Sequence, residues 1–226
     1  MGVERVRDRL LQFRRILRKR FFEAEFTQWR KNHGRDIEFE PIPALAVDLS
    51  AIEERLGRPL HGVLGYSFLG SRAVRIDYPA RRVDIYDAAL DAGASPGAVV
   101  LPLELEGTDV IIDDFRVNGQ PVRVSLDTGS SLTLEIYDHA ADRLGLAALR
   151  DGAEEGTVVG ARGEASILTV TVDSIGIGDL VIDSPSVVFP ETSRAVDGNL
   201  GNGYLRHYVL TVDYLGKRLV LEPGSG

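Results

Sequence analysis

The feature that most constrains the fold of this chain is an internal repeat. Residues 61–87 align with residues 197–223 without a gap, at a constant offset of 136 positions. Self-similarity of this kind predicts two copies of one structural unit. We call the two stretches the first and second repeat segments. The identical pairs are Gly62/Gly198, Leu64/Leu200, Gly65/Gly201, Leu69/Leu205, Asp77/Asp213, Tyr78/Tyr214 and Arg82/Arg218.

A second feature lies between the repeat segments, where an apolar strand pattern ends in a carboxylate. Val122, Val124 and Leu126 alternate with polar residues, which is the period of a half-buried strand, and Asp127 follows directly. Gly129, two residues later, permits another backbone to approach closely. An acid at the end of an apolar run is an unusual place for a charge. The simplest structural explanation is an aspartate that hydrogen-bonds its own turn.

The repeat also predicts the domain organisation. The offset places the counterpart of Asp127 before Met1, so we expect one complete unit and one copy that lacks its front end. The complete unit would span residues 99–223. The incomplete lobe would span residues 1–87, and the Ala-, Gly-, Ser- and Pro-rich residues 88–98 would be a linker.

The region before the first repeat segment shows mixed patterns. Residues 1–20 are expected to form a basic amphipathic helix; its arginines could face nucleic acid or a membrane, but a solvated helix face is the commoner reason. Charges run through its apolar positions, which is not the pattern of a secretory signal. Residues 22–39 alternate as a β-hairpin, with a continued helix as the rival. Ser50 begins a short helix with a capping-box pattern, which ends at Gly57.

Local signals around Asp127 predict further elements. Asn118-Gly119 is a tight hairpin turn that leads into the strand before Asp127. Residues 136–146 are expected to be a helix, and residues 155–165 a polar hairpin punctuated by glycine.

Composition narrows the possible functions. The chain has 226 residues, 44% apolar and 27% charged, as is ordinary for a globular protein. Its net charge of −8 argues against nucleic-acid partners, and it has no apolar run long enough for a transmembrane segment. There is no Cys, and the four His are scattered, so no metal and no cofactor are expected. Nucleophile-elbow and phosphate-loop motifs are absent from the sequence.

The residues around Asp127 carry a family resemblance. Leu126-Asp127-Thr128-Gly129-Ser130 is followed about seventy residues later by Asp197-Gly198-Asn199-Leu200-Gly201 and by an apolar strand ending in Asp213-Tyr214. This order resembles the retropepsin-like aspartic proteases, and most of all the bacterial aspartyl-protease-like proteins. The resemblance covers residues 99–222 in full and residues 20–87 in part. It implies a mainly β chain with short helices, closed into an acid-protease β-barrel.

The resemblance also implies roles for individual residues. Asp127 would be the catalytic carboxylate. Thr128 would brace the catalytic loops through its hydroxyl, Gly129 would admit substrate or a partner backbone, and Ser130 would hydrogen-bond the outer carboxylate oxygen. Leu200 and Gly201 would pack behind the loop. The Gly-rich segment 156–163, with Gly156, Val158, Val159 and Gly160, would be the flap. Asn199 stands where the family usually has an apolar residue.

The implied chemistry is hydrolysis of peptide bonds by a pair of aspartates. Two carboxyls that share one proton can activate a water and protonate the leaving nitrogen. We therefore expect an aspartic endopeptidase in which two chains each contribute Asp127, as a C2 homodimer acting on a peptide or protein substrate. The alternative is an inert or peptide-binding protein, in which a lone Asp127 faces the incomplete lobe. A fragment of a longer protein with two aspartates is a related possibility.

Overall fold

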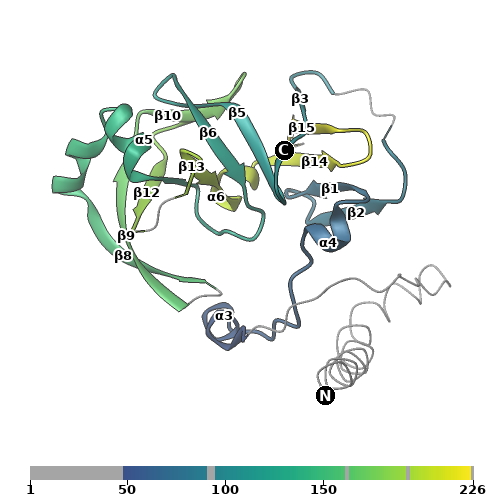
Figure 1. The fold of residues 1–226 in the computed structure, drawn as a ribbon, viewed down its shortest axis with the longest axis horizontal. Helices are drawn as coiled ribbons and strands as arrows, with labels where there is room; N and C mark the ends of the chain where they lie inside the picture. The colour runs from purple at the N-terminus through teal and green to yellow at the C-terminus, as the bar shows by residue number, and fades with distance from the viewer. Residues whose placement is uncertain (1–47, 91–94, 161–162, 192–193, 225–226) are drawn as a thin grey trace, which may run out of the picture. The chain divides into compact units, whose positions relative to one another are not determined.

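The structure is a computed structural model, shown in Figure 1. It describes residues 48–90, 95–160, 163–191 and 194–224. By its internal contacts the chain divides into two units, residues 1–67 and residues 68–226, which are described separately. The helix expected over residues 1–20 and the hairpin expected over residues 22–39 lie outside the described residues. None of the helices in the described ranges is long and apolar enough to cross a membrane.

The described part of the first unit contains the helix α3 (Ser50–Leu56). It begins and ends where the sequence predicts, because Gly57 adopts the left-handed conformation, at φ +65°, that stops a helix. The expected capping box does not form. Instead, Asp48 Oδ1 accepts the backbone N–H of Ser50 at 2.9 Å. The carboxylate of Asp48 thus binds the first backbone N–H of the helix, which has no partner within the helix.

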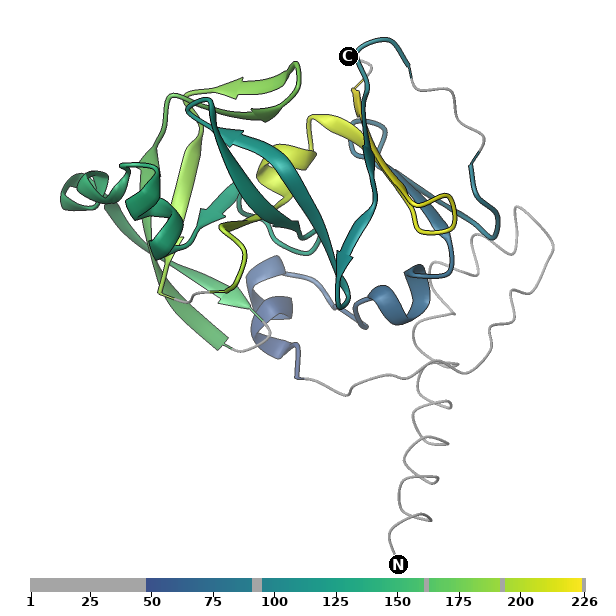
Figure 2. The same ribbon diagram turned by 45° about the horizontal axis from the view of Figure 1, so that its top comes forward.

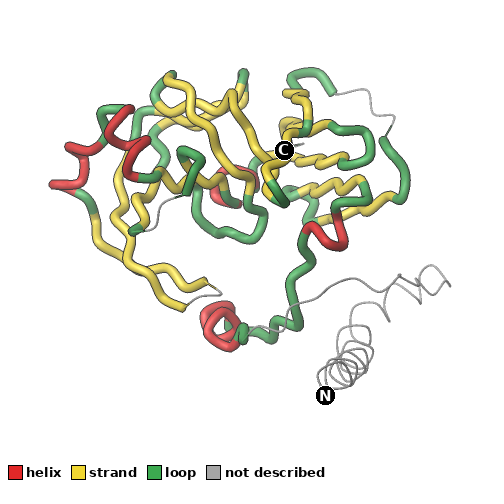
Figure 3. The backbone as a smooth tube through the Cα atoms, viewed as in Figure 1, coloured by secondary structure: helices red, strands yellow, loops and turns green. Residues whose placement is uncertain are grey.

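The second unit consists mainly of β-strands with a few short helices, as expected (Figure 3). One sheet has five strands in the order β2-β1-β14-β15-β3. Its strands are β1 (Ala73–Asp77), β2 (Arg82–Tyr86), β3 (Val99–Pro102), β14 (Tyr208–Asp213) and β15 (Arg218–Pro223).

A ten-stranded sheet carries the strand that precedes Asp127. Its order is β11-β10-β5-β6-β13-β7-β12-β9-β8, and β4 pairs separately with β5. Its strands are β4 (Glu104–Glu106), β5 (Asp109–Val117), β6 (Gln120–Leu126), β7 (Leu134–Ile136), β8 (Glu154–Gly160), β9 (Gly163–Thr171), β10 (Ser174–Ile177), β11 (Leu180–Asp183), β12 (Ser186–Pro190) and β13 (Gly198–Leu200).

The closed β-barrel that the resemblance implies is not found. Among the described strands, β11 pairs only with β10 and β8 pairs only with β9, so the larger sheet has two open ends. The smaller sheet likewise ends at β2 and β3. The fold is therefore better described as two open sheets than as a barrel.

Short helices lie beside the larger sheet. The helix expected over residues 136–146 is shorter, because Ile136 still belongs to β7 and pairs with Gly198 of β13. The helix α5 (Asp138–Arg143) follows, and then the 3-10 helix η1 (Ala147–Gly152). Figure 2 shows both near one end of the larger sheet, away from β14 and β15.

Three strands meet at the centre of the larger sheet. There β13 runs parallel to β6, with Leu200 opposite Leu126, and antiparallel to β7 on its other side. The approach is close at Gly198, where a Cβ would lie 2.3 Å from the carbonyl oxygen of Glu135. Only glycine fits at such a distance, so the glycine of the Asp-Gly-Asn motif is needed for the strands to pack.

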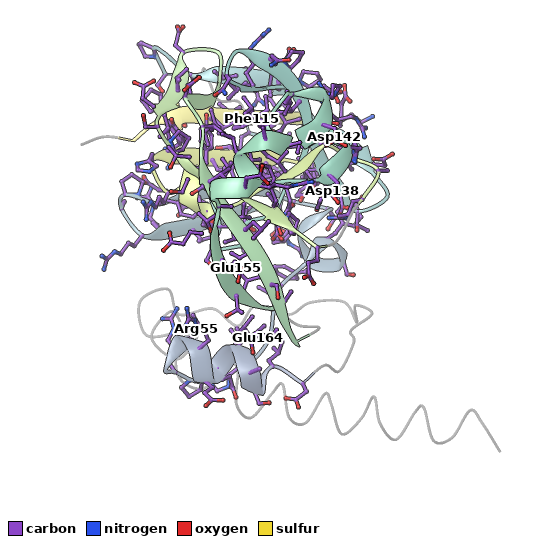
Figure 4. The ribbon with its side chains drawn as sticks, turned by 90° about the vertical axis from the view of Figure 1, so that its left-hand side faces the viewer. Arg55, Phe115, Asp138, Asp142, Glu155 and Glu164 are labelled. Atoms are coloured by element: carbon purple, nitrogen blue, oxygen red, sulfur yellow. The ribbon has the colours of Figure 1, made fainter. Side chains whose placement is uncertain are left out.

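One hydrophobic core joins both sheets of the second unit. The Phe115 ring meets the Tyr204 ring edge-on, with their centroids 5.1 Å apart, and both are fully buried. Tyr204 lies in the short helix α6 (Asn202–Leu205), and its hydroxyl donates to the carbonyl of Leu180 at 2.6 Å. Figure 4 shows Phe115 inside the unit. Because its polar end is satisfied, Tyr204 can fix the segment after β13 within the core.

The five-stranded sheet pairs strands from the two repeat segments. Strand β1 runs antiparallel to β14, with Ala73 opposite Asp213 and Asp77 opposite Val209. The offset of the repeat takes residue 73 to residue 209 and residue 77 to residue 213. Ala73 is therefore equivalent to Val209, and Asp77 is equivalent to Asp213, so the repeat exchanges the two pairs. This is the register that a local two-fold axis produces.

Local geometry also agrees at equivalent positions of the repeat. The carboxylate of Asp77 accepts the N–H of Ala80 at 3.0 Å, and the carboxylate of Asp213 accepts the N–H of Gly216 at 2.7 Å. Residues 81 and 217, although not glycine, both have φ +53°. The one-turn helix α4 (Tyr66–Leu69) and α6 also have equivalent bounds.

The predicted division into residues 1–87, 88–98 and 99–223 remains a prediction. The contacts divide the chain between Ser67 and Phe68, and β1 and β2 belong to the same sheet as β14 and β15. The first strands after the division are thus integral to the second unit.

Candidate active site

Asp127 is placed by the strand before it and by a neighbouring parallel strand. Strand β6 ends at Leu126, and the backbone N–H of Asp127 donates to the carbonyl of Leu200 at 2.8 Å. This bond continues the β6–β13 ladder by one residue and then the chain turns. The sequence-predicted Asp127 and Leu200 are therefore in direct contact, although 73 positions separate them.

The loop after Asp127 folds back on the carboxylate. The N–H of Gly129 donates to Asp127 Oδ1 at 2.8 Å, and the N–H of Ser130 donates to the Asp127 carbonyl at 3.2 Å. A Cβ on Gly129 would lie 3.1 Å from that Oδ1, which is tight for a side chain. Gly129 is thus suited to a turn in which a backbone donor orients a carboxylate.

The structure shows one contact each for Ser130 and Thr128 that the sequence did not predict. The Oγ of Ser130, expected to bond the carboxylate, accepts the N–H of Leu132 at 3.2 Å. Thr128 is exposed, and its carbonyl accepts the side-chain amide of Asn202 at 2.7 Å. The bracing role of the Thr128 hydroxyl remains a prediction, since it requires a facing loop.

Leu200 and Gly201 lie behind the loop. Leu200 is fully buried, and the N–H of Gly201 donates to the carbonyl of Thr133 at 3.2 Å. A Cβ on Gly201 would lie 2.4 Å from the carbonyl oxygen of Leu132. The backbone of this pair therefore contacts the loop with no room for a side chain.

A tyrosine of the first repeat segment reaches the same loop, which the sequence did not reveal. The hydroxyl of Tyr78 donates to Asn202 Oδ1 at 2.7 Å, and the amide nitrogen of Asn202 bonds Thr128. The backbone N–H of Asn202 also donates to the Ser130 carbonyl at 2.8 Å. Burial and then the negative charge of Asp127 raise the pKa of Tyr78 to about 12, so its hydroxyl stays protonated at neutral pH.

A buried asparagine joins Asp127 to a second carboxylate. Asn199 Oδ1 accepts the hydroxyl of Ser125 at 2.7 Å, so its amide nitrogen faces the other way. That nitrogen donates to Glu135 Oε2 at 2.7 Å and, at 3.4 Å, to Asp127 Oδ2. One signal in the sequence pointed to this arrangement of Asn199, Glu135 and Asp127. Asn199 is polar, whereas the family that the chain resembles usually has an apolar residue at this position.

Glu135 is half-buried, and its surroundings disfavour its charge. Burial raises the pKa of Glu135 above its ordinary value, and the carboxylate of Asp127 raises it further. The hydrogen bond from Asn199 and the positive charge of Arg194 act in the opposite direction. The raised pKa therefore means that Glu135 binds a proton more readily than an exposed glutamate.

The expected flap residues lie on a two-stranded hairpin. In it β8 and β9 pair with Val159 opposite Glu164 and Gly160 opposite Gly163. Figures 1 and 4 show the hairpin extending from the larger sheet, with Glu155 and Glu164 on its two strands. Gly156 and Gly160 are exposed, and Val158 and Val159 are half-buried. The polar hairpin expected from the sequence is thus present.

Comparison with known proteins bears on these residues. Residues 114–204, about two fifths of the chain, match the sequence model of a family described as aspartyl protease. Over these residues the chain is similar to the aspartyl protease family. The matched segment contains Asp127, Asn199 and the β8–β9 hairpin, so the whole candidate site except Tyr78 lies within it.

Similar solved structures include one retropepsin-like enzyme. A crystal structure of a retropepsin-like aspartic protease from Rickettsia conorii matches at 20% identity and a TM-score of 0.45. The match covers 55% of this chain and 89% of that one. No curated protein matches the chain.

The loop that begins at Asp127 faces solvent. Asp127, Thr128 and Gly129 are all exposed, whereas Ser125 and Asn199 behind them are buried. No cluster of side chains suited to holding a metal ion lies among the residues that the structure describes. The carboxylate is therefore oriented from behind by the chain and is open in front.

Proposed function

We propose that this protein is an aspartic-type endopeptidase in which Asp127 supplies one carboxyl of the water-activating pair. The observation that carries the proposal is the placement of Asp127. Asp127 directly follows strand β6, its carboxylate is oriented by the N–H of Gly129 at 2.8 Å, and the residue is exposed. A carboxylate that is held in place and open to solvent can bind a water and a substrate carbonyl together.

The reaction needs a second carboxyl. One carboxylate takes a proton from the water while the water oxygen bonds to the peptide carbonyl carbon. The facing carboxyl then gives its proton to the nitrogen as the carbon–nitrogen bond breaks. Two carboxyls this close do not ionise together easily, so the pair would share one proton at acidic pH.

In the proposed assembly the second carboxyl is Asp127 of another copy of the chain. The exposure of Asp127, Thr128 and Gly129 supports this arrangement, because a facing loop would cover those residues. A C2 interface would also give the Thr128 hydroxyl a loop to brace. The hairpin residues Gly156, Val158, Val159 and Gly160 would cover the bound peptide as a flap.

A second candidate is a peptide-binding protein with a single aspartate, and the register of β1 on β14 favours it. If the repeat segments are two copies of one unit, the first copy takes the place that a second chain would occupy at β14. Asp127 would then face residues of its own chain. This arrangement has one carboxylate and predicts binding without hydrolysis.

A peptidase assay over a range of acidic to neutral pH separates the candidates. We expect the wild type to cleave a mixed peptide library, to be inhibited by a statine-type transition-state analogue, and to lose activity by roughly a thousandfold in Asp127→Asn. Asp179→Asn is the matched control, since Asp179 is an exposed aspartate in the β10–β11 turn. Wild-type protein that is inactive at every pH but still binds peptides would support the second candidate.

A further inference from the structure

Glu135 and Asp127 lie on opposite sides of one buried amide. Glu135 is on β7, Asp127 follows β6, and Asn199 belongs to β13, which pairs with both strands. Asn199 is only 5% exposed and its amide nitrogen donates to both carboxylates, at 2.7 Å to Glu135 and 3.4 Å to Asp127. The two acids are therefore held by the same group in the centre of the sheet.

The orientation of Asn199 is fixed from behind. The hydroxyl of the buried Ser125 bonds Asn199 Oδ1 at 2.7 Å, which leaves the amide nitrogen for the carboxylates. No buried side-chain nitrogen or oxygen among the described residues lacks a hydrogen-bond partner. A satisfied polar group of this kind costs little in the interior and specifies one geometry.

We propose that Glu135 is a positioning residue for the Asp127 carboxylate, acting through the side-chain amide of Asn199. The inference rests on the proposed peptidase function for its activity readout, but the coupling itself does not require catalysis. Glu135 accepts the stronger of the two hydrogen bonds and so fixes the position from which Asn199 reaches Asp127. The carboxylate of Asp127 in turn opposes ionisation of Glu135, because like charges this near disfavour each other.

The charges around Glu135 are few, so its effect can be isolated. From β13 it meets only the neutral Asn199, and Asp127 comes from the loop after β6. The segment before β13 contributes Arg194, which is also paired with Asp109. Tyr137, which directly follows β7, is the neighbour along the chain. Burial and the charge of Glu135 raise the pKa of Tyr137, so its hydroxyl is neutral. On β12 the paired residue is Val188, which has no charge.

The first test compares kcat and KM in Glu135→Leu and Glu135→Gln. Leucine removes the acceptor of the Asn199 amide, whereas glutamine keeps an oxygen that can accept it. We expect kcat to fall roughly tenfold in Glu135→Leu with a smaller change in KM, and to be largely retained in Glu135→Gln, because only leucine frees the amide that reaches Asp127. Glu191→Gln, which removes an exposed charge after β12, should leave both constants unchanged. An unchanged kcat in folded Glu135→Leu overturns the proposal.

A second test uses a variant of Asn199. Asn199→Leu installs the apolar residue usual in the family and removes the bridge while both carboxyls remain. We expect kcat/KM to fall at least about tenfold with a smaller change in KM, because the carboxylate loses its orientation. Unchanged kcat in folded Asn199→Leu contradicts the role of the bridge.

A third measurement works without activity and without altering β7. Carbon-13 NMR follows the titration of the Glu135 carboxyl in wild type and in Asp127→Asn. We expect Glu135 to titrate at lower pH in Asp127→Asn, because a neighbouring negative charge has been removed. Identical titrations overturn the proposal. If the wild type has no peptidase activity, the proposed function fails, while this comparison still decides whether Glu135 and Asp127 are coupled.

Discussion

Arg75 and Thr211 are one repeat offset apart in the sequence, and they lie directly opposite each other in β1 and β14. In an antiparallel pair, two equivalent residues face each other only where a two-fold relation passes between them. Residues on either side then exchange partners, as Ala73 and Asp213 do with Asp77 and Val209. The centre of the small sheet therefore relates the two repeat segments as the subunits of a C2 dimer are related.

This register can be tested by cross-linking, because the chain has no cysteine of its own. We expect the double variant Arg75→Cys with Thr211→Cys to form a disulfide on mild oxidation, since opposite residues of antiparallel strands have suitable Cα separations. The product should be an intrachain bond, seen as a monomer of altered mobility on non-reducing gels.

The two single-cysteine variants are the controls for that experiment. Neither should give a monomer of altered mobility. If the double variant yields only disulfide-linked dimers, β1 pairs with β14 of another chain, and the pairing described within one chain is wrong.

Mixing experiments distinguish a two-chain active site from a one-chain site. Wild-type protein is equilibrated with increasing amounts of Asp127→Asn and its peptidase activity is measured. If each site needs Asp127 from two chains, mixed dimers are inactive, so we expect activity to fall faster than simple dilution predicts. Activity that stays proportional to wild-type protein would mean that one chain suffices. Added Asp179→Asn, which keeps Asp127, should not reduce activity.

Tyr78→Phe should loosen the loop after Asp127 without changing the core. The variant loses the hydrogen bond from the hydroxyl to Asn202, which is 2.7 Å long. We expect a loss of about 1 kcal/mol in the free energy of unfolding, the usual net value for one hydrogen bond. Urea unfolding at neutral pH measures it. A loss of several kcal/mol would indicate a packing defect instead.

The same variant makes a prediction about alkaline pH. The folded pKa of Tyr78, about 12, exceeds the ordinary value of 10.0. Its contribution to stability is thus fully present below pH 10 and is lost as pH rises toward 12. We expect the difference in unfolding free energy between wild type and Tyr78→Phe to shrink over this range. A constant difference would show that the hydroxyl is not protected from ionisation.

Gly201→Ala should be strongly destabilising for steric reasons alone. The φ of Gly201, −114°, is accessible to alanine, but the added Cβ would meet the Leu132 carbonyl at 2.4 Å. We expect a loss of about 1–3 kcal/mol or more, as for overpacking in a rigid interior. Thermal unfolding followed by circular dichroism measures the loss.

Gly152→Ala is the matched control, since a Cβ there would meet nothing within 4 Å. Its stability should stay within about 0.5 kcal/mol of the wild type. Equal stability of both variants would mean that β13 does not approach the loop as closely as described.

Local patterns predicted the parts of the fold that depend on local chemistry. The hairpin turn at Asn118-Gly119 forms with φ +49° and +76°, as the Asn-Gly pair requires. The strand before Asp127 and the helix from Ser50 to Leu56 were also predictable, because alternation and a left-handed glycine at the end specify them. The open sheets were not, since strand closure depends on partners far away in the sequence.

The part of the candidate site that lies in one short stretch of sequence could be predicted. Asp127 and Gly129 interact within two residues, so the sequence alone placed them together. The hydrogen bond between Asn199 and Glu135 joins residues 64 positions apart. The one between Tyr78 and Asn202 joins residues 124 positions apart. No periodicity relates such residues, and only the tertiary pairing of β13 with β7 and of β1 with β14 brings them together.

The reach of Tyr78 has a consequence for how the protein assembles. Tyr78 directly follows β1, and its hydroxyl supports the loop of Asp127 through Asn202. That support exists only after the β1–β2 hairpin has docked on β14. The loop after Asp127 should therefore gain its last hydrogen bonds only once the β1–β2 hairpin has docked. A ligand that loosens this hairpin would weaken the loop without touching it.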